Sequence, residues 1–322
     1  MKRRAAGLAL ATFALFLPGL SLGQSFPERP IKLIVPYPPG ASTDALARIV
    51  AQKVSTSLGQ PVVIENKAGA SGNIGTEIGS RSAPDGYTIM LGTDATHAAN
   101  YHMLKDPPFH PLRDFTPLTL AAMNPIALVV HPSVPAKNVT DLIDWVKANP
   151  GKGGFGSSGN GSPHHLAGEL LKARSGAPLL HVPYRGGGPA LNDLIGGQIH
   201  ILFASAITVI PHIQSGKATA IAVTSTERYQ GLPDVPTIAE SLSGFDVPSW
   251  LAFFGPVNMP AQIAKRLSDE IIKALKDPEV AAKVNAAGLV VAAGSPEELA
   301  AIQRKDYESK GKLIRDAGLR AE

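Results

Sequence analysis

The 322-residue sequence contains no cysteine. The chain therefore has no disulfide bonds, no thiolate metal ligands and no cysteine that could carry a lipid at the start of a mature protein. It also lacks a marked excess of one charge, because 30 Lys and Arg residues face 26 Asp and Glu residues and three of the basic ones lie at positions 2–4. We expect no nucleic acid as a partner, since such binding needs a strongly basic surface.

Long hydrophobic runs are missing beyond the N-terminus. The best later candidate, residues 199–210, has the length of a core strand or helix and falls short of the ~20 residues of a membrane span. The N-terminus differs, because basic residues 2–4 precede an apolar stretch at 5–17 and a small-x-small pattern at 21–23. This pattern predicts a signal peptide that is cleaved near Gly23, and export to the periplasm.

The remaining chain is long enough for two lobes, because it exceeds the size at which one hydrophobic core keeps growing. Strand and helix patterns alternate from residue 31 to 104 and, after a proline-rich connection, again from 118 to 223. Such alternation is typical of a mostly parallel sheet with helices on both faces. An apolar run at 250–255 is followed only by helical patterns, so we interpret this run as a return to the first lobe.

The sequence thus predicts an α/β fold of two lobes, each a mostly parallel sheet flanked by helices, with two crossings between the lobes. The predicted boundaries are a signal peptide at 1–23, a first lobe at 24–125 and 251–322, and a second lobe at 126–250. Ligands on such sheets bind beyond the carboxyl ends of the strands, where loops and helix N-termini converge.

Two loops have the composition of anion sites. The first, residues 36–44, connects a strand to a helix; Gly40 frees its backbone, and Ser42 or Thr43 can cap the helix, whose first N–H groups are unpaired. The second, residues 156–163, is rich in glycine and serine and also opens a helix. A plain capped loop is the alternative for each. Residues 154–159 match G-x-G-x-x-G, but the match begins inside the strand and no acidic residue ends the next strand, so we expect no dinucleotide and no other cofactor.

Catalysis and metal binding have weaker support. Ser157 and Ser158 lie near His164 and His165, yet neither serine sits in a G-x-S-x-G turn. Adjacent histidines on a helix point about 100° apart, and His181 completes no ligand set with them. We predict that the chain is not an enzyme and keep a secreted α/β hydrolase as the alternative.

Two further strand ends offer polar groups. Tyr184 and Arg185 open a third glycine-rich loop, where Arg185 can grip a carboxylate or simply be solvated. Thr93, Asp94, Thr96 and His97 follow another strand and can contact a ligand, although a helix cap at Thr93 or Asp94 is equally compatible with the pattern.

Seven segments in this order resemble the Bug family, the extracytoplasmic solute receptors of tripartite tricarboxylate transporters. They are residues 30–37 (PIKLIVPY), 59–67 (GQPVVIENK), 72–75 (GNIG), 83–88 (APDGYT), 165–170 (HLAGEL), 181–184 (HVPY) and 232–237 (LPDVPT).

The resemblance implies a type II-like periplasmic binding protein whose lobes close on a small organic carboxylate. It also implies a monomer that hands its ligand to integral-membrane large and small transporter subunits. The ligand-binding residues that we predict from the resemblance and the loops are Tyr37, Gly40, Ala41, Ser42, Thr43, Asp44, Thr93, His97, Ser157, Ser158, Asn160, Gly161, Ser162, His165, Tyr184, Arg185, Ala204 and Ser205.

Two departures from the family pattern bear on the ligand. Ala41 replaces a second glycine of the first loop, and Ala204-Ser205 replaces the usual Asp-Asn, which removes a carboxylate from the pocket wall. An amino-acid ligand is disfavoured by this loss, so we expect a dicarboxylate, with aromatic terephthalate as the lead candidate. A ligand sensor for a two-component system would share this pocket and is the other alternative.

Overall fold

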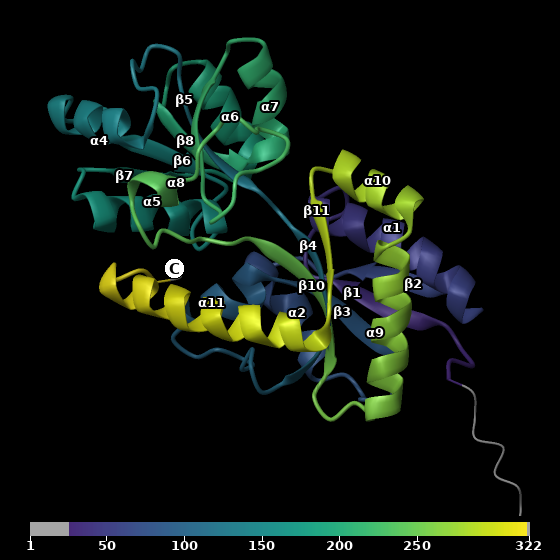
Figure 1. The fold of residues 1–322 in the computed structure, drawn as a ribbon. Helices are drawn as coiled ribbons and strands as arrows, with labels where there is room; N and C mark the ends of the chain where they lie inside the picture. Colours follow the sequence, from purple (N-terminus) through teal and green to yellow (C-terminus); the bar gives the residue numbers. More distant parts are fainter. Residues whose placement is uncertain (1–25, 321–322) are drawn as a thin grey trace, which may run out of the picture.

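The computed structural model describes residues 26–320, so the predicted signal peptide at 1–23 lies outside the described residues. Two α/β lobes are joined by extended segments, and the predicted two-lobed α/β fold is confirmed (Figure 1). No helix within residues 26–320 is long and apolar enough to cross a membrane.

The first lobe is built on a six-stranded sheet. Its strands, in spatial order, are β11 (Val290–Gly294), β4 (Phe115–Met123), β10 (Trp250–Pro256), β3 (Thr88–Thr93), β1 (Ile31–Val35) and β2 (Val62–Asn66). Strand β1 pairs in parallel with β2 and β3, whereas β10 is antiparallel to both β3 and β4, and β11 is antiparallel to β4.

The second lobe is built on a five-stranded sheet. Its strands, in spatial order, are β7 (Leu180–Pro183), β6 (Gly154–Ser157), β8 (Ile201–Ser205), β5 (Ile126–Val130) and β9 (Thr219–Val223). Strand β6 is parallel to β7 and β8, and β5 is antiparallel to β8 and β9.

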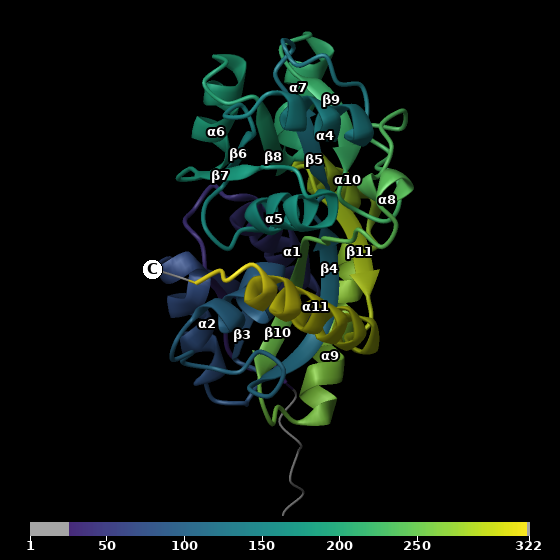
Figure 2. The ribbon, with the colours of Figure 1, turned by 90° about the vertical axis from the view of Figure 1, so that its left-hand side faces the viewer.

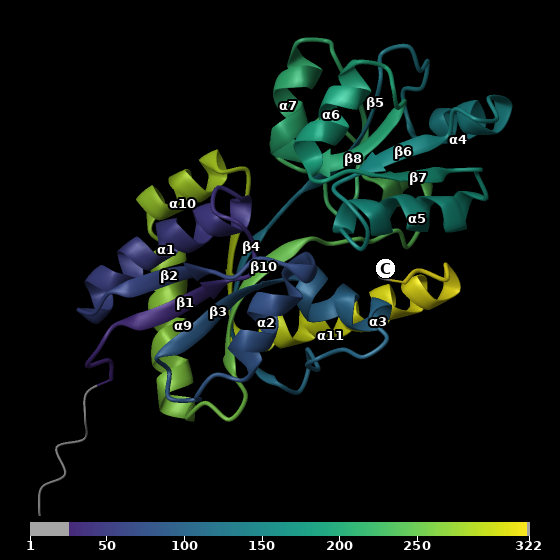
Figure 3. The same cartoon turned by 180° about the vertical axis from the view of Figure 1, so that it is seen from behind.

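Helices cover both faces of each sheet because each sheet is apolar on both faces. On the first sheet, α1 (Ser42–Leu58), α9 (Ala261–Leu275) and α10 (Pro278–Ala286) lie on one face, and α2 (Asn73–Ser80), η2 (Ala95–Ala99), α3 (Asn100–Met103) and α11 (Pro296–Asp316) lie on the other, as Figure 3 shows. On the second sheet, α4 (Val139–Ala148), α5 (Pro163–Ser175) and α8 (Ile238–Ser241) lie opposite α6 (Gly187–Ile195) and α7 (Ala206–Gln214).

The C-terminal helix α11 connects the two lobes. It begins at a capping box of Ser295 and Glu298, with Pro296 in its first turn, where the missing N–H costs least. Its last turns lie beside α5 (Figure 2), and Ile314 belongs to the same apolar cluster as Phe155 of the second sheet. The last turns of α11 therefore pack against the second lobe although its first turns cover the first sheet.

The two crossings run side by side. Asn124, after β4, donates its backbone N–H to the carbonyl of Ser249 at 2.8 Å, and Ala206 donates to Pro125 at 2.8 Å. The chain leaves the first sheet after β4 and returns at β10.

Two predictions about the sheets were wrong. Both sheets are mixed rather than mostly parallel, because the strands next to the crossings run antiparallel to their neighbours. The segment after residue 256 also contains β11, a short strand whose Val-Val-Ala-Ala-Gly sequence is too brief and too poor in β-branched residues to stand out between helices.

Candidate ligand-binding cleft

The first predicted loop is braced by Asp44. The carboxylate of Asp44 accepts hydrogen bonds from the Gly40 N–H at 3.0 Å, from Arg48 at 2.9 and 3.0 Å, and from Asn66 at 3.0 Å. The Arg48 guanidinium, aided by the Gly40 and Asn66 donors, lowers the pKa of Asp44 to about 2 despite its burial. Asp44 thus holds the turn at Gly40, where φ is +85°, and its own acceptors are already occupied.

The helix that follows this loop starts without a side-chain cap. Its N-cap is Ala41, and among the described residues no protein acceptor binds the N–H groups of the first turn at Ser42, Thr43 and Asp44. The Thr43 hydroxyl is also buried without a hydrogen-bond partner in the described part of the chain. Unpaired donors at a helix start attract an anion.

Tyr37 ties the first loop to the end of β3. Its hydroxyl lies 3.0 Å from the Thr93 hydroxyl, and its carbonyl accepts from Asn66 at 3.0 Å. Burial raises the pKa of Tyr37 to about 12, and the charge of nearby Asp94 adds to this effect. Tyr37 and Thr93 therefore form one polar group at the carboxyl ends of two neighbouring parallel strands.

The second loop is held by serine and histidine side chains. Ser157 lies 2.6 Å from His181 Nε2, and Ser158 lies 2.7 Å from His164 Nδ1. Ser162 caps α5 by accepting the His165 N–H, and His165 Nδ1 in turn accepts the Gly161 N–H at 3.1 Å. No described residue accepts the backbone N–H groups of Ser158 and Asn160, so these donors are available to a ligand.

The histidines of this loop are neutral. Burial lowers the pKa of His165 to about 3 and the pKa values of His164 and His181 to about 4. His165 stacks on His181 with ring centroids 3.7 Å apart. Within residues 26–320 no group of three His, Cys, Asp or Glu side chains is placed to hold a metal ion.

Three observations bring the two loops together. Strands β3 and β8 both end beside the crossings, since Thr93 pairs with Leu251 and Ser205 pairs with Ile126. A Cβ atom on Gly161 would lie 2.4 Å from Met103 of the first lobe. Asp94 also acts electrostatically on both Tyr37 and His164, which belong to opposite lobes: its charge adds to the rise in the pKa of Tyr37 and opposes the lowering of the pKa of His164 by burial. The second loop therefore approaches the first lobe at Met103, and Tyr37 of the first loop lies near the same carboxylate as His164 of α5.

The other predicted site residues differ in their exposure and contacts. His97 and Ala204 were expected to line the pocket, and this is wrong in the observed arrangement. His97 is 0% exposed and stacks on Phe254 at 4.0 Å, whereas Ala204 is 2% exposed within an apolar cluster of the second lobe. Tyr184 donates its hydroxyl to Asp193 at 2.7 Å, and Arg185 is exposed at the start of α6.

Asp94 and His164 lie beside the predicted loops, although neither was among the predicted ligand-binding residues. Asp94 was interpreted as a possible helix cap, yet its side chain caps nothing in the described chain; Ser249 and Lys310 donate to it instead. His164 has a buried Nε2 with no partner among the described residues. Its position next to the helix cap Ser162 was the only available signal.

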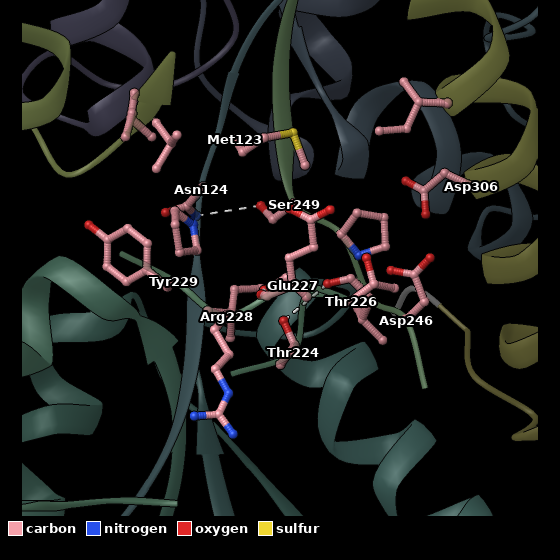
Figure 4. A pocket seen from close by; sticks show the side chains of 18 of the residues that line it. Met123, Asn124, Thr224, Thr226, Glu227, Arg228, Tyr229, Asp246, Ser249 and Asp306 are labelled. Carbon is pink, nitrogen blue, oxygen red and sulfur yellow. Dashed lines mark hydrogen bonds between the residues drawn. The ribbon is translucent and has the colours of Figure 1, made fainter. Parts of the chain in front are cut away.

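A separate cavity of about 570 Å³ lies at the crossings. Figure 4 shows its lining, with Asn124 near Ser249 and the Asp306 carboxylate at its edge. A second cavity of about 980 Å³, between α5 and α11, shares Asp246 and Lys305 with the first. None of the predicted ligand-binding residues lines either cavity.

Comparisons with known proteins agree with the family resemblance of the sequence. A family model described as "Tripartite tricarboxylate transporter family receptor" matches residues 46–319. A "UPF0065 protein in tcbD-tcbE intergenic region" of Pseudomonas sp. (strain P51) is 39% identical, with 99% of this chain and 95% of that protein covered. Protein BugT of Bordetella pertussis is 34% identical, with 97% and 96% covered.

Three solved structures have the same overall fold. Periplasmic binding protein BugD has a TM-score of 0.77 at 34% identity, with 92% of this chain and 100% of that chain covered. R. palustris Rpa4515 with adipate has a TM-score of 0.80 at 32% identity (92% and 99% covered), and MatC from Rhodopseudomonas palustris with bound malate has 0.77 at 29% identity (90% and 100% covered).

Proposed function

This chain belongs to the receptor family of tripartite tricarboxylate transporters, and from that premise we propose that it captures a small organic dicarboxylate between its lobes. The observation that supports the proposal is a pair of loops on opposite lobes, after β1 and β6, whose N–H donors have no protein acceptor within residues 26–320. We propose that these loops face each other beside Thr93. Donors from two lobes favour the closed arrangement only when one ligand accepts from both.

The ligand class follows from the charges around the cleft. No carboxylate occupies the end of β8, where Ser205 stands, so nothing there attracts the ammonium group of an amino acid. Arg185 is exposed and free to pair with a second carboxylate of the ligand. Adipate and malate, named with two related structures, are both dicarboxylates, and we keep terephthalate as the lead candidate.

A hydrolase is disfavoured by the surroundings of both serines. Ser157 is 0% exposed, and its oxygen already accepts the Gly159 N–H. Ser158 contacts His164, but no carboxylate in residues 26–320 hydrogen-bonds to this imidazole to orient it as a base. We therefore propose a receptor without catalytic activity, exported to the periplasm as a monomer and delivering its ligand to the large and small membrane subunits. A sensing role would use the same cleft.

A thermal-shift screen tests the proposal. Purified mature protein would be melted with mono-, di- and tricarboxylates and with amino acids. A true ligand at 100 times its dissociation constant adds ~2.7 kcal/mol to the free energy of unfolding, and we expect this from a dicarboxylate. Stabilisation by amino acids alone, or by none of these compounds, would refute the proposal. Turnover of a bound ester that is lost in Ser158→Ala would favour the hydrolase.

A further inference from the structure

A buried charge network links α11 to the base of the cleft. Lys310 donates to Asp94 at 2.6 Å, to Asp306 at 2.8 Å and to the Pro248 carbonyl at 3.1 Å. All three charged side chains are at most 3% exposed. The network also binds the second crossing, the segment that leads into β10. Ser249 donates to Asp94 at 3.1 Å, and Trp250 donates to Asp306 at 3.0 Å.

The two carboxylates of this network occupy different places. Asp94 follows Thr93, the partner of Tyr37, and its charge acts on Tyr37 and on His164, one in each lobe: it adds to the rise in the pKa of Tyr37 and opposes the lowering of the pKa of His164 by burial. Asp306 lies on α11 and borders the separate cavity at the crossings (Figure 4). A negative charge at Asp94 would therefore repel a carboxylate ligand held between the loops, whereas the same charge at Asp306 acts from farther away.

We propose that Lys310 determines the anion selectivity of the cleft by neutralising Asp94. Within residues 26–320 the Lys310 ammonium hydrogen-bonds to Asp94, Asp306 and Pro248 and to no predicted ligand-binding residue, so we expect it to act through Asp94. Although burial opposes its charge, the Asp306 and Asp94 carboxylates raise the pKa of Lys310, so the side chain stays cationic. The inference rests on the proposed capture of a dicarboxylate. It adds that the charge of Lys310 reduces the repulsion between the buried Asp94 carboxylate and an anionic ligand.

A matched pair of double variants isolates this effect. Lys310→Met with Asp306→Asn leaves Asp94 as the bare carboxylate, and Lys310→Met with Asp94→Asn leaves Asp306 instead. Each variant removes one positive and one negative charge, and each retains one neutral donor to the remaining carboxylate, from Ser249 or Trp250. Their costs in stability should be similar, so a difference in affinity reports the position of the charge.

The assay is calorimetric titration with terephthalate and with adipate between pH 7 and pH 8. In this range we expect the variant that keeps Asp94 to bind roughly tenfold or more weakly than the parent, since unit charges several ångströms apart interact with this strength at an effective dielectric constant of ~20. The variant that keeps Asp306 should bind within about threefold of the parent.

The groups that face Asp94 support assigning such a loss of affinity to this carboxylate. They are Lys310 and Asp306 on α11, Tyr37 in the first loop, and His164 on α5. Tyr37, with a pKa of about 12, and His164, with a pKa of about 4, both remain neutral across the assay range. In the decisive variant Lys310 and Asp306 no longer carry charge.

Single variants keep the proposal testable if a double variant does not fold. Asp94→Asn leaves the Lys310–Asp306 pair intact and should tighten binding more than Asp306→Asn, which leaves the Lys310–Asp94 pair. Equal affinities within the double pair, or equal effects of the two single variants, would overturn the inference while leaving the receptor function in place. A parent protein that binds no carboxylate would instead refute the proposed function, and the inference with it.

Discussion

Substituting Gly161 by alanine should weaken ligand binding through a contact between the lobes. Gly161 lies in the second loop with φ +73°, and a Cβ atom there would lie 2.4 Å from Met103 Cε and 3.1 Å from Met103 Sδ. Met103 belongs to α3 of the first lobe. The substitution therefore has two effects, a backbone strain within the loop and a clash that exists only when the lobes are together.

The two effects have different magnitudes and different assays. The left-handed backbone costs an alanine ~1–2 kcal/mol in any arrangement of the lobes, which lowers the free energy of unfolding in urea. Moving the flexible end of Met103 off its rotamer costs ~0.5–1.5 kcal/mol, and only in the closed arrangement. Calorimetric titration should therefore give an affinity loss of about two- to tenfold.

Two variants serve as controls for Gly161→Ala. Gly176 ends α5, the helix that follows the loop of Gly161, and it also has a left-handed backbone with φ +63°. No atom lies within 4 Å of its Cβ position, so Gly176→Ala should lower the free energy of unfolding without lowering the affinity. Adding Met103→Ala to Gly161→Ala removes the clash and should restore most of the affinity. Equal affinities of Gly161→Ala and Gly176→Ala would refute the contact between the closed lobes.

Three further predictions concern stability. Ser162→Ala removes the cap of α5 and should lower the free energy of unfolding by about 1 kcal/mol in urea titration; an unchanged midpoint would contradict the cap. Asp44, with a pKa of about 2, stabilises the folded state above its unfolded pKa near 4, so this contribution should be lost from pH 4 to 2 and be absent in Asp44→Asn. His97 has a pKa of about 3 in the folded state, so as the pH falls the unfolded chain takes up a proton at this residue at a higher pH than the folded protein does. Stability should thus fall as the pH drops below about 6.5, by up to ~1.4 kcal/mol per pH unit, and the slope should decrease in His97→Phe; equal slopes would contradict the buried neutral imidazole.

The periodicity of the sequence predicted most elements because local spacing determines them. The helix α9, for example, carries Leu267, Ile271, Ala274 and Leu275 at helical spacing, and all of them are buried. Strand direction was not predictable in the same way. Whether β10 enters the first sheet parallel or antiparallel depends on the path of the chain through the second lobe, and no local pattern records that path.

The candidate site was predictable where one short segment builds it. The loops at Gly40 and Ser158 each show a strand end, small residues and a helix start within a few positions. The Asp94–Lys310 pair joins residues 216 positions apart, so neither residue carried a local sign of its role. His97 was misassigned because a polar residue after a strand resembles a pocket residue, whereas its ring packs between Phe115 and Phe254.

The absence of cysteine from the chain permits a direct measurement of lobe closure. Spin labels on Gln52→Cys of α1 and Lys147→Cys of α4, both exposed, would report the distance between the lobes by pulsed electron paramagnetic resonance. We predict a broad, longer distribution without ligand and a single shorter distance once a dicarboxylate saturates the protein. A bound dicarboxylate that leaves the distribution unchanged would contradict capture by closure of the two lobes.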